Sequence, residues 1–321
     1  MPHHPGAGPR HLGRGRGHGR AFPGRLPGDQ PIAAPRPPGQ SAAMSMILWR
    51  DGLTVAGADD GARRPWWSLT KTAIAAGVLA LARDGLVALD EPLPVPGATP
   101  RALLLHRAGL PDYGWLAGYH AAVAEGGPAW SAGEMLARAA FLAPPAAGFS
   151  YSNIGYMHLR QLVEARMGMP FSAAIRSLVL GPLGLTATAL ADAPGVPGHP
   201  DYDPGWVYHG LLMGPVEEMA LFLHRLFTGP LLPRELLAMM RAAEPVGGAL
   251  PGRPWLTPGY GLGLMAGEIA PGIRMEGHTG GGPGSAIVAY RRPDTVSVVA
   301  GFAEGPAGDA LESEAARLLL A

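Results

Sequence analysis

Apolar positions are spaced as in β-strands near both ends of the chain and as in helices between them. Near the start, apolar runs at residues 46–49 and 53–56 flank Asp51-Gly52, a pair typical of tight turns, and together they predict a β-hairpin. Towards the end, apolar runs and alternation predict more strands, followed by a closing helix. These elements are strands over residues 259–265, 273–275, 285–290 and 295–302, and a helix over residues 308–320.

The middle of the chain shows helical spacing. Ile74 and Val78 lie on one apolar face of a helix expected over residues 72–86. The same criterion predicts helices over residues 101–107, 132–141, 154–167, 171–179 and 216–227. A Pro/Gly/Asp-rich loop is expected over residues 191–205, and long loops in compact domains are often functional. Residues 206–209 (Trp-Val-Tyr-His) at its end either line a substrate pocket or seal the loop, and sealing is the favoured interpretation.

Strands at both ends with helices between them predict an α+β fold. An antiparallel sheet formed from both chain ends is flanked by helices and carries a large, mostly helical insertion. We expect the folded domain to span residues 44–321. Residues 1–43 are mainly Gly, Pro, Arg and His and cannot bury enough apolar surface to offset the entropy of ordering, so we expect a disordered leader. A wrongly assigned start codon is the alternative, because Met44 or Met46 would begin the folded part at once.

Charge is placed unevenly, although the 321 residues carry no net charge. Residues 1–43 contain six Arg and one Asp, which leaves 19 basic and 24 acidic residues in the remainder. An acidic body argues against nucleic acid as a partner, because nucleic acid binds basic surfaces. The absence of Cys excludes disulfides and thiolate chemistry, and no apolar run reaches the ~18 residues of a membrane span. Because no secretory signal is visible either, we expect a cytoplasmic protein.

Lys71 is the only lysine in the chain, whereas the other basic residues are all Arg. Arginine stays protonated, but a buried lysine can lose its proton and act as a base. Ser68 lies three residues earlier, on the same helical face and near a helix N-terminus that favours developing negative charge. This arrangement suits a serine nucleophile beside a lysine base. Ser-x-x-Lys is a short pattern, however, and a structural lysine at an apolar helix is the alternative.

Two further stretches contain residues suited to catalysis. In the first, Tyr151 is a phenol able to relay a proton, and Asn153 either caps the following helix or donates its amide to a substrate carbonyl. In the second, His278-Thr279 precedes three glycines at residues 280–282, which either let a ligand approach the backbone closely or form a plain turn.

The three motifs, Ser-x-x-Lys at 68–71, Tyr-x-Asn at 151–153 and His-x-Gly at 278–280, resemble in their order those of the serine β-lactamase and penicillin-binding protein superfamily. The chain is most similar to the branch that holds class C β-lactamases, D-alanyl-D-alanine carboxypeptidases, D-aminopeptidases and family VIII carboxylesterases. The resemblance covers residues 46–321. Other similar segments are Leu-Leu-Leu-His-Arg-Ala-Gly-Leu-Pro at 103–111, Ser-Tyr-Ser-Asn-Ile-Gly-Tyr at 150–156, Gly-Pro-Leu-Gly-Leu at 181–185, Tyr-Gly-Leu-Gly at 260–263 and Gly-His-Thr-Gly-Gly at 277–281.

The resemblance implies a serine hydrolase that works through an acyl-enzyme. Ser68 would be the nucleophile, and Lys71 and Tyr151 would share the transfer of its proton, with the identity of the base left open. We favour a pair that holds one proton fewer than its full complement, because a protonated lysine beside a neutral phenol cannot accept the serine proton. The N–H groups of Ser68 and Gly281 would form the oxyanion hole, and no metal or organic cofactor is implied. The residues implied in binding the substrate or its oxyanion are Asn153, His278, Thr279, Gly280 and Gly281.

The third motif departs from class C β-lactamases, which have lysine where this chain has His278. The departure favours an esterase, or a peptidase or amidase acting on D-amino acids, with a small ester or amide as substrate. The alternatives are a β-lactamase and a penicillin-binding or scaffold protein that keeps the fold without turnover. Only 24 positions separate Met44 from Ser68, fewer than such proteins usually carry before the nucleophile. One face of the sheet could therefore be exposed and covered by a second copy, which would give a homo-oligomer.

Overall fold

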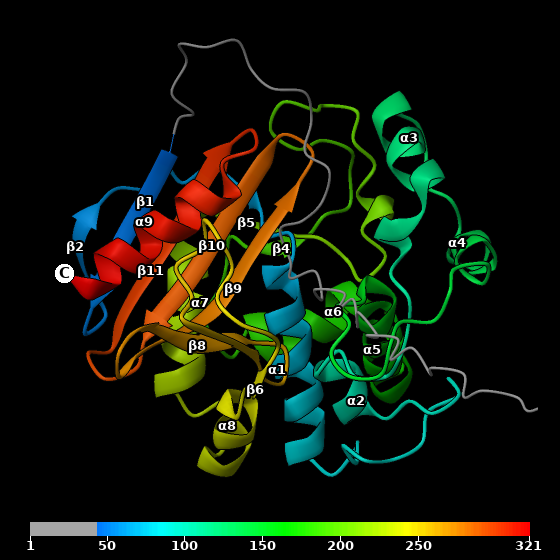
Figure 1. Cartoon of the computed structure of the whole chain (residues 1–321), viewed down its shortest axis with the longest axis horizontal. Coiled ribbons are helices and arrows are strands. Elements are labelled where there is room, and N and C mark those ends of the chain that lie inside the picture. Colours follow the sequence, from blue (N-terminus) through cyan, green and yellow to red (C-terminus); the bar gives the residue numbers. More distant parts are fainter. Residues whose placement is uncertain (1–43) are drawn as a thin grey trace, which may run out of the picture.

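The computed structural model describes residues 44–321, so the leader expected at residues 1–43 lies outside the described residues. The larger of the two sheets in this part of the chain has eight antiparallel strands in the order β2-β1-β11-β10-β9-β8-β7-β6 (Figure 1). Strand β1 pairs with β11 from Met44↔Ala303 to Arg50↔Ser297, which confirms a sheet built from both ends. The strands are β1 (Met44–Arg50), β2 (Leu53–Gly57), β6 (Glu244–Pro245), β7 (Thr257–Tyr260), β8 (Met265–Ala270), β9 (Ile273–Gly282), β10 (Ser285–Arg292) and β11 (Ser297–Glu304), with β3 (Arg64–Pro65), β4 (Ala189–Leu190) and β5 (Leu212–Gly214) in a small second sheet.

Helices lie on both faces of the large sheet, and all of them except α9 come from the segment between its first and last strands (Figure 1). They are α1 (Leu69–Arg83), α2 (Pro100–Leu104), α3 (Ala117–Glu125), α4 (Ala132–Ala139), α5 (Asn153–Met167), α6 (Phe171–Ile175), α7 (Val216–Thr228), α8 (Arg234–Arg241) and α9 (Gly308–Leu320). Helix α9 packs on β9, β10 and β11, with Leu311 and Leu319 in an apolar core on that face. Helices α1 and α7 contact the opposite face, where Ile74 and Phe222 lie in a larger core. The predicted α+β class, with a mostly helical insertion, is confirmed.

The strand expected over residues 259–265 is wrong, because β7 and β8 are joined there by a turn. Gly261 N–H donates to the Leu264 carbonyl over 2.8 Å, and Gly263 has a φ of +74°. A left-handed φ is available to glycine at no steric cost, so the alternating glycines that resemble a strand in sequence form a turn instead. Helices α3 and α8 are also present where the sequence pattern predicted none.

The small sheet holds the segment that precedes the nucleophile. Strand β5 lies between β3 and β4, and β3 leads directly into Trp66. The Trp66 N–H donates to the Leu212 carbonyl over 2.8 Å, and the Leu212 N–H donates to Thr70 Oγ1 over 3.2 Å. Strand β5 therefore bonds to the chain on both sides of Ser68.

Strand β2 forms one edge of the large sheet and is exposed along its whole length. Leu53 and Val55 are 71% and 52% exposed. We expected a second copy to cover an exposed face of the sheet, and the homo-oligomer stays a prediction. Within residues 44–321, none of the helices combines the length and the apolar character that crossing a bilayer requires.

Candidate active site

Ser68 lies at the N-terminus of α1, at the end of a tight turn through Trp66 and Trp67. Trp67 has a left-handed φ of +41°, and its indole N–H donates to Ser285 Oγ over 3.1 Å. A side chain on Gly282 would collide with its ring, because a Cβ there would lie 2.5 Å from it. Non-glycine residues keep such a conformation only where their surroundings hold them. Trp67 therefore fixes Ser68 against the hairpin of β9 and β10.

The hydroxyl of Ser68 meets two of the predicted catalytic groups. Ser68 Oγ lies 3.2 Å from Lys71 Nζ and 3.0 Å from the Tyr151 hydroxyl. Ser68 and Tyr151 are partly accessible, whereas Lys71 is fully buried one turn into α1. A nucleophile within hydrogen-bond reach of a base and of a second proton carrier is the geometry that activated serines require.

Burial separates the acid–base behaviour of Lys71 from that of Tyr151. It lowers the pKa of Lys71 to about 7, although the negative charge of Asp112 partly opposes this change. It raises the pKa of Tyr151 well above its ordinary value, and nearby Tyr260 adds to the rise. The amine can therefore gain or lose a proton near neutral pH, while the phenol stays a neutral donor.

Asn153 is held by a buried carboxylate rather than acting as the helix cap. Ser152 is the N-cap of α5, because its Oγ accepts from the Gly155 N–H over 3.2 Å. Asn153 follows it, and its backbone N–H and side-chain amide both donate to Asp112, over 2.7 and 3.2 Å. Burial raises the pKa of Asp112, whereas these donors oppose the rise. The sequence pattern did not single out Asp112 and gave no signal for this bond.

His106 supports Tyr151 from behind. Its Nδ1 accepts from the Ser152 N–H over 3.1 Å, so the ring proton belongs on Nε2. The ring lies 4.2 Å from that of Tyr151 and 4.8 Å from that of Tyr260, centroid to centroid. Burial and the charge of Lys71 keep the pKa of His106 well below its ordinary value, so a neutral imidazole packs against the phenol.

Strand β9 brings the glycines of the third motif to the nucleophile. A Cβ on Gly280 would lie 2.7 Å from Ser68 N, so the strand approaches as closely as a backbone can. Gly281 is exposed, with only the Ser285 carbonyl near its Cβ position. The Thr279 hydroxyl donates to the Ile287 carbonyl over 3.1 Å.

We expected His278 to contact substrate, but the structure places its ring in the protein interior. It is fully buried, and its Nε2 accepts from the Tyr260 hydroxyl over 3.0 Å. Its Nδ1 donates to the Thr279 carbonyl. Burial lowers the pKa of His278 to about 3, so the ring is neutral and both nitrogens are used within the protein. The imidazole of His278 therefore supports β9 and Tyr260 instead of contacting substrate.

His209 is a neighbour of the site that the sequence pattern did not single out. Its Nε2 lies 3.3 Å from Lys71 Nζ, and the imidazole is buried. The pattern placed this residue at the end of the long loop, where the Tyr208 hydroxyl donates to the Trp130 carbonyl over 3.1 Å, and the sealing of the loop stays a prediction. No motif marks a lone histidine at the end of a loop, so only the fold reveals its contact with Lys71.

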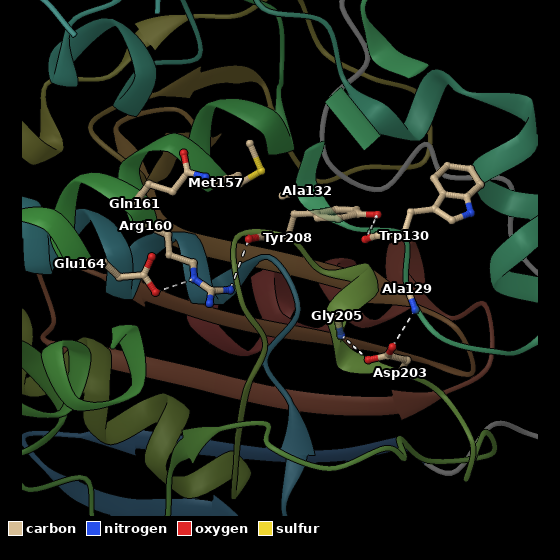
Figure 2. A pocket seen from close by; sticks show the side chains of 10 residues that line it. All are labelled: Ala129, Trp130, Ala132, Met157, Arg160, Gln161, Glu164, Asp203, Gly205 and Tyr208. Carbon is tan, nitrogen blue, oxygen red and sulfur yellow. Dashed lines mark hydrogen bonds and ion pairs between the residues drawn. The ribbon is translucent and has the colours of Figure 1, made fainter. Parts of the chain in front are cut away.

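A cavity of about 330 Å³ opens beside α5, next to this segment. Figure 2 shows Arg160 and Glu164 of α5 on one side and Asp203 and Tyr208 of the loop on the other. Its lining contains none of the predicted catalytic residues, and Tyr208 is its connection to the site because His209 follows directly. Within residues 44–321 no group of three or more His, Cys, Asp or Glu side chains is placed to hold a metal ion.

Comparisons with known proteins find relatives of this chain. A model of the family described as Beta-lactamase matches residues 33–321. Penicillin-binding protein 4* of Bacillus subtilis (strain 168) is 30% identical over 156 residues, which are 44% of this chain and only 34% of that protein. The D-amino acid amidase of Ochrobactrum anthropi SV3 superposes with a TM-score of 0.73 at 24% identity, over 86% of this chain and 94% of that one. The structure of SurE with D-Leu gives a TM-score of 0.63 at 28% identity, over 86% and 70% of the two chains.

Proposed function

The chain belongs to the beta-lactamase family, and we propose that it is a serine hydrolase that cleaves small esters or amides through an acyl-enzyme at Ser68. One observation carries the proposal: Ser68 Oγ lies within hydrogen-bond distance of both Lys71 Nζ and the Tyr151 hydroxyl. The depressed pKa of Lys71, about 7, supports its assignment as the base. The pair then lacks one proton, and the missing proton is that of the amine.

In acylation, the neutral amine of Lys71 takes the hydroxyl proton of Ser68 while Oγ bonds to the substrate carbonyl carbon. The carbonyl oxygen becomes an oxyanion, which the N–H groups of Ser68 and Gly281 bind. The Tyr151 phenol donates its proton to the leaving oxygen or nitrogen and regains one from the Lys71 ammonium. The ester or amide bond breaks, and the acyl group stays on Ser68.

After acylation Lys71 is neutral again. In deacylation, water attacks the acyl carbonyl and gives a proton to this neutral amine. The bond between the carbonyl carbon and Ser68 Oγ breaks, the serine recovers its proton, and the acid is released. The neutral amide of Asn153 is available to orient the acyl group, because Asp112 fixes it at the start of α5.

A substrate without a carboxylate suits this site best. Within the described part of the chain, the third motif supplies no cation, since His278 is neutral and the Thr279 hydroxyl donates to Ile287. A β-lactam or a D-alanyl-D-alanine peptide would present a carboxylate there without a positive partner. Esters and amides therefore come before β-lactams. The amide of a D-amino acid is the first amide to test, because the D-amino acid amidase of Ochrobactrum anthropi shares this fold.

The test uses the full chain with p-nitrophenyl acetate, D-phenylalaninamide, L-phenylalaninamide and penicillin G in separate reactions. Product release and intact mass are followed, and a fluorophosphonate adduct is mapped to its residue. We expect ester turnover, preference for the D-amide and an adduct on Ser68. The Ser68→Ala variant should lose both the adduct and at least roughly a thousandfold of turnover.

The Ser313→Ala variant serves as a matched control, because it also removes a serine hydroxyl but from an exposed position on α9, where Ser313 bonds to the Gly252 carbonyl. Equal labelling or turnover in wild type and Ser68→Ala would remove Ser68 as the nucleophile. A stable penicillin adduct without turnover of any ester or amide would favour the penicillin-binding alternative.

A further inference from the structure

The strongest unassigned feature of the molecule is the contact between His209 and Lys71. His209 is 2% exposed, and its Nε2 lies 3.3 Å from Lys71 Nζ. Its Nδ1 is buried without a hydrogen-bond partner among the described residues. A buried imidazole that leaves one nitrogen unpaired carries a cost, so its single bond, to the amine, needs an explanation.

The backbone around His209 holds the imidazole firmly at the amine. Gly210 N–H donates to the Val207 carbonyl over 2.6 Å, which places His209 in a tight turn. Gly210 has a φ of +95°, and a Cβ there would lie 3.2 Å from the ring of Phe171. From the cavity side, Arg160 donates to the Tyr208 carbonyl over 3.4 Å (Figure 2). These bonds hold both sequence neighbours of His209, namely Tyr208 and Gly210, in place.

The chemistry of Lys71 explains why an acceptor is useful at this position. A neutral amine has two N–H groups and one lone pair, and only the lone pair can take the proton of Ser68. If one N–H is bonded to a second, fixed acceptor, rotation about the last carbon–nitrogen bond is restricted. The lone pair is then presented to the hydroxyl. Once protonated, the ammonium has only donors, so the same acceptor serves in both states.

We propose that His209 is a positioning residue, a neutral imidazole whose Nε2 accepts a hydrogen bond from Lys71 and keeps the amine directed at Ser68. The proposal rests on the proposed function of the Ser68 site. It assigns the ring proton to Nδ1, the nitrogen that has no other partner.

The surrounding charges keep His209 neutral. The titratable or charged groups that face it are Lys71, Arg160, His278 and His106, and the charge of Asp112 acts on Lys71. Burial lowers the pKa of His209 well below its ordinary value, and the positive charge of Lys71 lowers it further. The imidazole therefore does not compete with Lys71 for the proton of Ser68.

Because Lys71 is the only lysine in the sequence, its protonation can be measured directly. Lysine labelled with carbon-13 at Cε gives one side-chain signal from the full chain, and its pH titration reports the pKa of Lys71. We expect the His209→Leu variant to lower this pKa by roughly one pH unit, because the buried ammonium loses its acceptor. His209→Gln, whose amide oxygen can accept, should restore most of the wild-type value.

The rate should change in the same pattern. In His209→Leu we expect kcat/KM for the ester to fall roughly tenfold to a hundredfold, mainly through kcat. The acidic limb of its pH–rate profile should move to lower pH, because the pKa of Lys71 is lower in this variant. His209→Gln should recover part of the loss. His158→Leu is the matched control, because this partly exposed histidine of α5 bonds only to Gln161 and should change neither quantity.

A Lys71 pKa that stays the same or rises in His209→Leu would overturn the proposal, since a rise would mean that the imidazole donates to the amine. If His209→Leu does not fold, as judged by circular dichroism, His209→Gln and His209→Ala carry the same comparison. The signal of Lys71 does not depend on turnover. A wild-type protein that neither turns over an ester nor acylates Ser68 would therefore defeat the proposed function without deciding the contact.

Discussion

Two buried polar clusters lie on opposite faces of the large sheet, and they differ in how their charges are paired. The Glu312 cluster, on the side of α9, consists of Glu312, Arg253, Trp255 and Tyr290. The Lys71 cluster, on the side of α1, consists of Lys71, Ser68, Tyr151 and His209. Glu312 accepts from Arg253 over 2.6 and 2.7 Å and from the indole of Trp255 over 3.0 Å. Lys71 has no carboxylate among the contacts described above.

This difference decides which cluster can change its protonation. Burial alone would lower the pKa of Arg253, but the hydrogen bonds and charge of Glu312 raise it above its ordinary value. Arg253 therefore stays charged beside Glu312. Burial lowers the pKa of Lys71 to about 7, because Asp112 opposes it only from a distance. Burial thus leaves an ion pair where the charge is matched and a titratable base where it is not.

The largest effect is expected from giving the Lys71 cluster a permanent charge. Lys71→Arg keeps a cation but cannot accept the proton of Ser68, so kcat/KM for an ester should fall by roughly a thousandfold or more. Lys71→Met removes the charge and should lose as much. Both are measured by ester turnover in variants whose circular dichroism matches wild type. An arginine variant that keeps a tenth of wild-type activity would show that Lys71 is not the base.

Unpairing the Glu312 cluster should act on stability instead. Glu312→Leu leaves Arg253 buried without its carboxylate and should lower the free energy of unfolding by roughly 3–5 kcal/mol, as measured by urea denaturation. Turnover per folded molecule should stay unchanged. The double variant with Arg253→Met should recover much of the loss, because the pair is then removed together. A double variant no more stable than Glu312→Leu would count against charge pairing as the cause.

Two adjacent glycines of strand β9, Gly280 and Gly281, offer a matched pair for testing the proposed oxyanion hole. A Cβ on Gly280 would lie 2.7 Å from Ser68 N, whereas one on Gly281 meets only the Ser285 carbonyl at 3.9 Å. Gly280→Ala should therefore displace an oxyanion donor and lower kcat roughly a hundredfold. Gly281→Ala keeps its N–H and should change kcat less than about threefold. Equal losses in the two variants would argue against an oxyanion hole at Ser68 N.

The smallest expected effect is a change in the free energy of unfolding with pH. The pKa of Lys71 is 10.5 in a free side chain and about 7 in the folded protein. Between these values the unfolded chain binds more protons, so the free energy of unfolding should rise with pH by up to ~1.4 kcal/mol per pH unit. Urea denaturation at pH 7 and pH 9 should show this gain in wild type and not in Lys71→Met. Parallel changes in the two proteins would mean that Lys71 does not titrate in this range.

The sequence pattern predicted an element correctly where the residues of that element alone determine its structure. Helix α5 was predicted within one residue because its apolar spacing is regular and Gly168 ends it in a left-handed conformation. The helix expected over residues 72–86 is observed as α1, which starts and ends three residues earlier. Its start was missed because the turn at Trp67 depends on the distant hairpin of β9 and β10. The strand expected over residues 259–265 failed because glycine alternation fits a turn as well as a strand.

The site was predictable where its residues form short motifs. The structure brings Ser68, Lys71 and Tyr151 together, while their catalytic roles stay predictions. Asp112 and His209 were missed because each acts through a contact made by folding, with no spacing that marks it. The role expected of His278 was wrong for the same reason, since only the fold shows that both of its ring nitrogens are already bonded.

The pairing of β1 with β11 has a consequence for the order in which the protein folds. Residues such as Trp49 and Val298 become neighbours only after roughly 250 intervening residues have been made, which takes about 10–50 s at the usual rates of translation. Strand β1 can therefore pair with β11 only after β11 has been synthesised, and pairing between strands so far apart in the sequence forms slowly. In pulse-labelled hydrogen exchange during refolding, we expect the amides of β1 to become protected together with those of β11 and after those of α5.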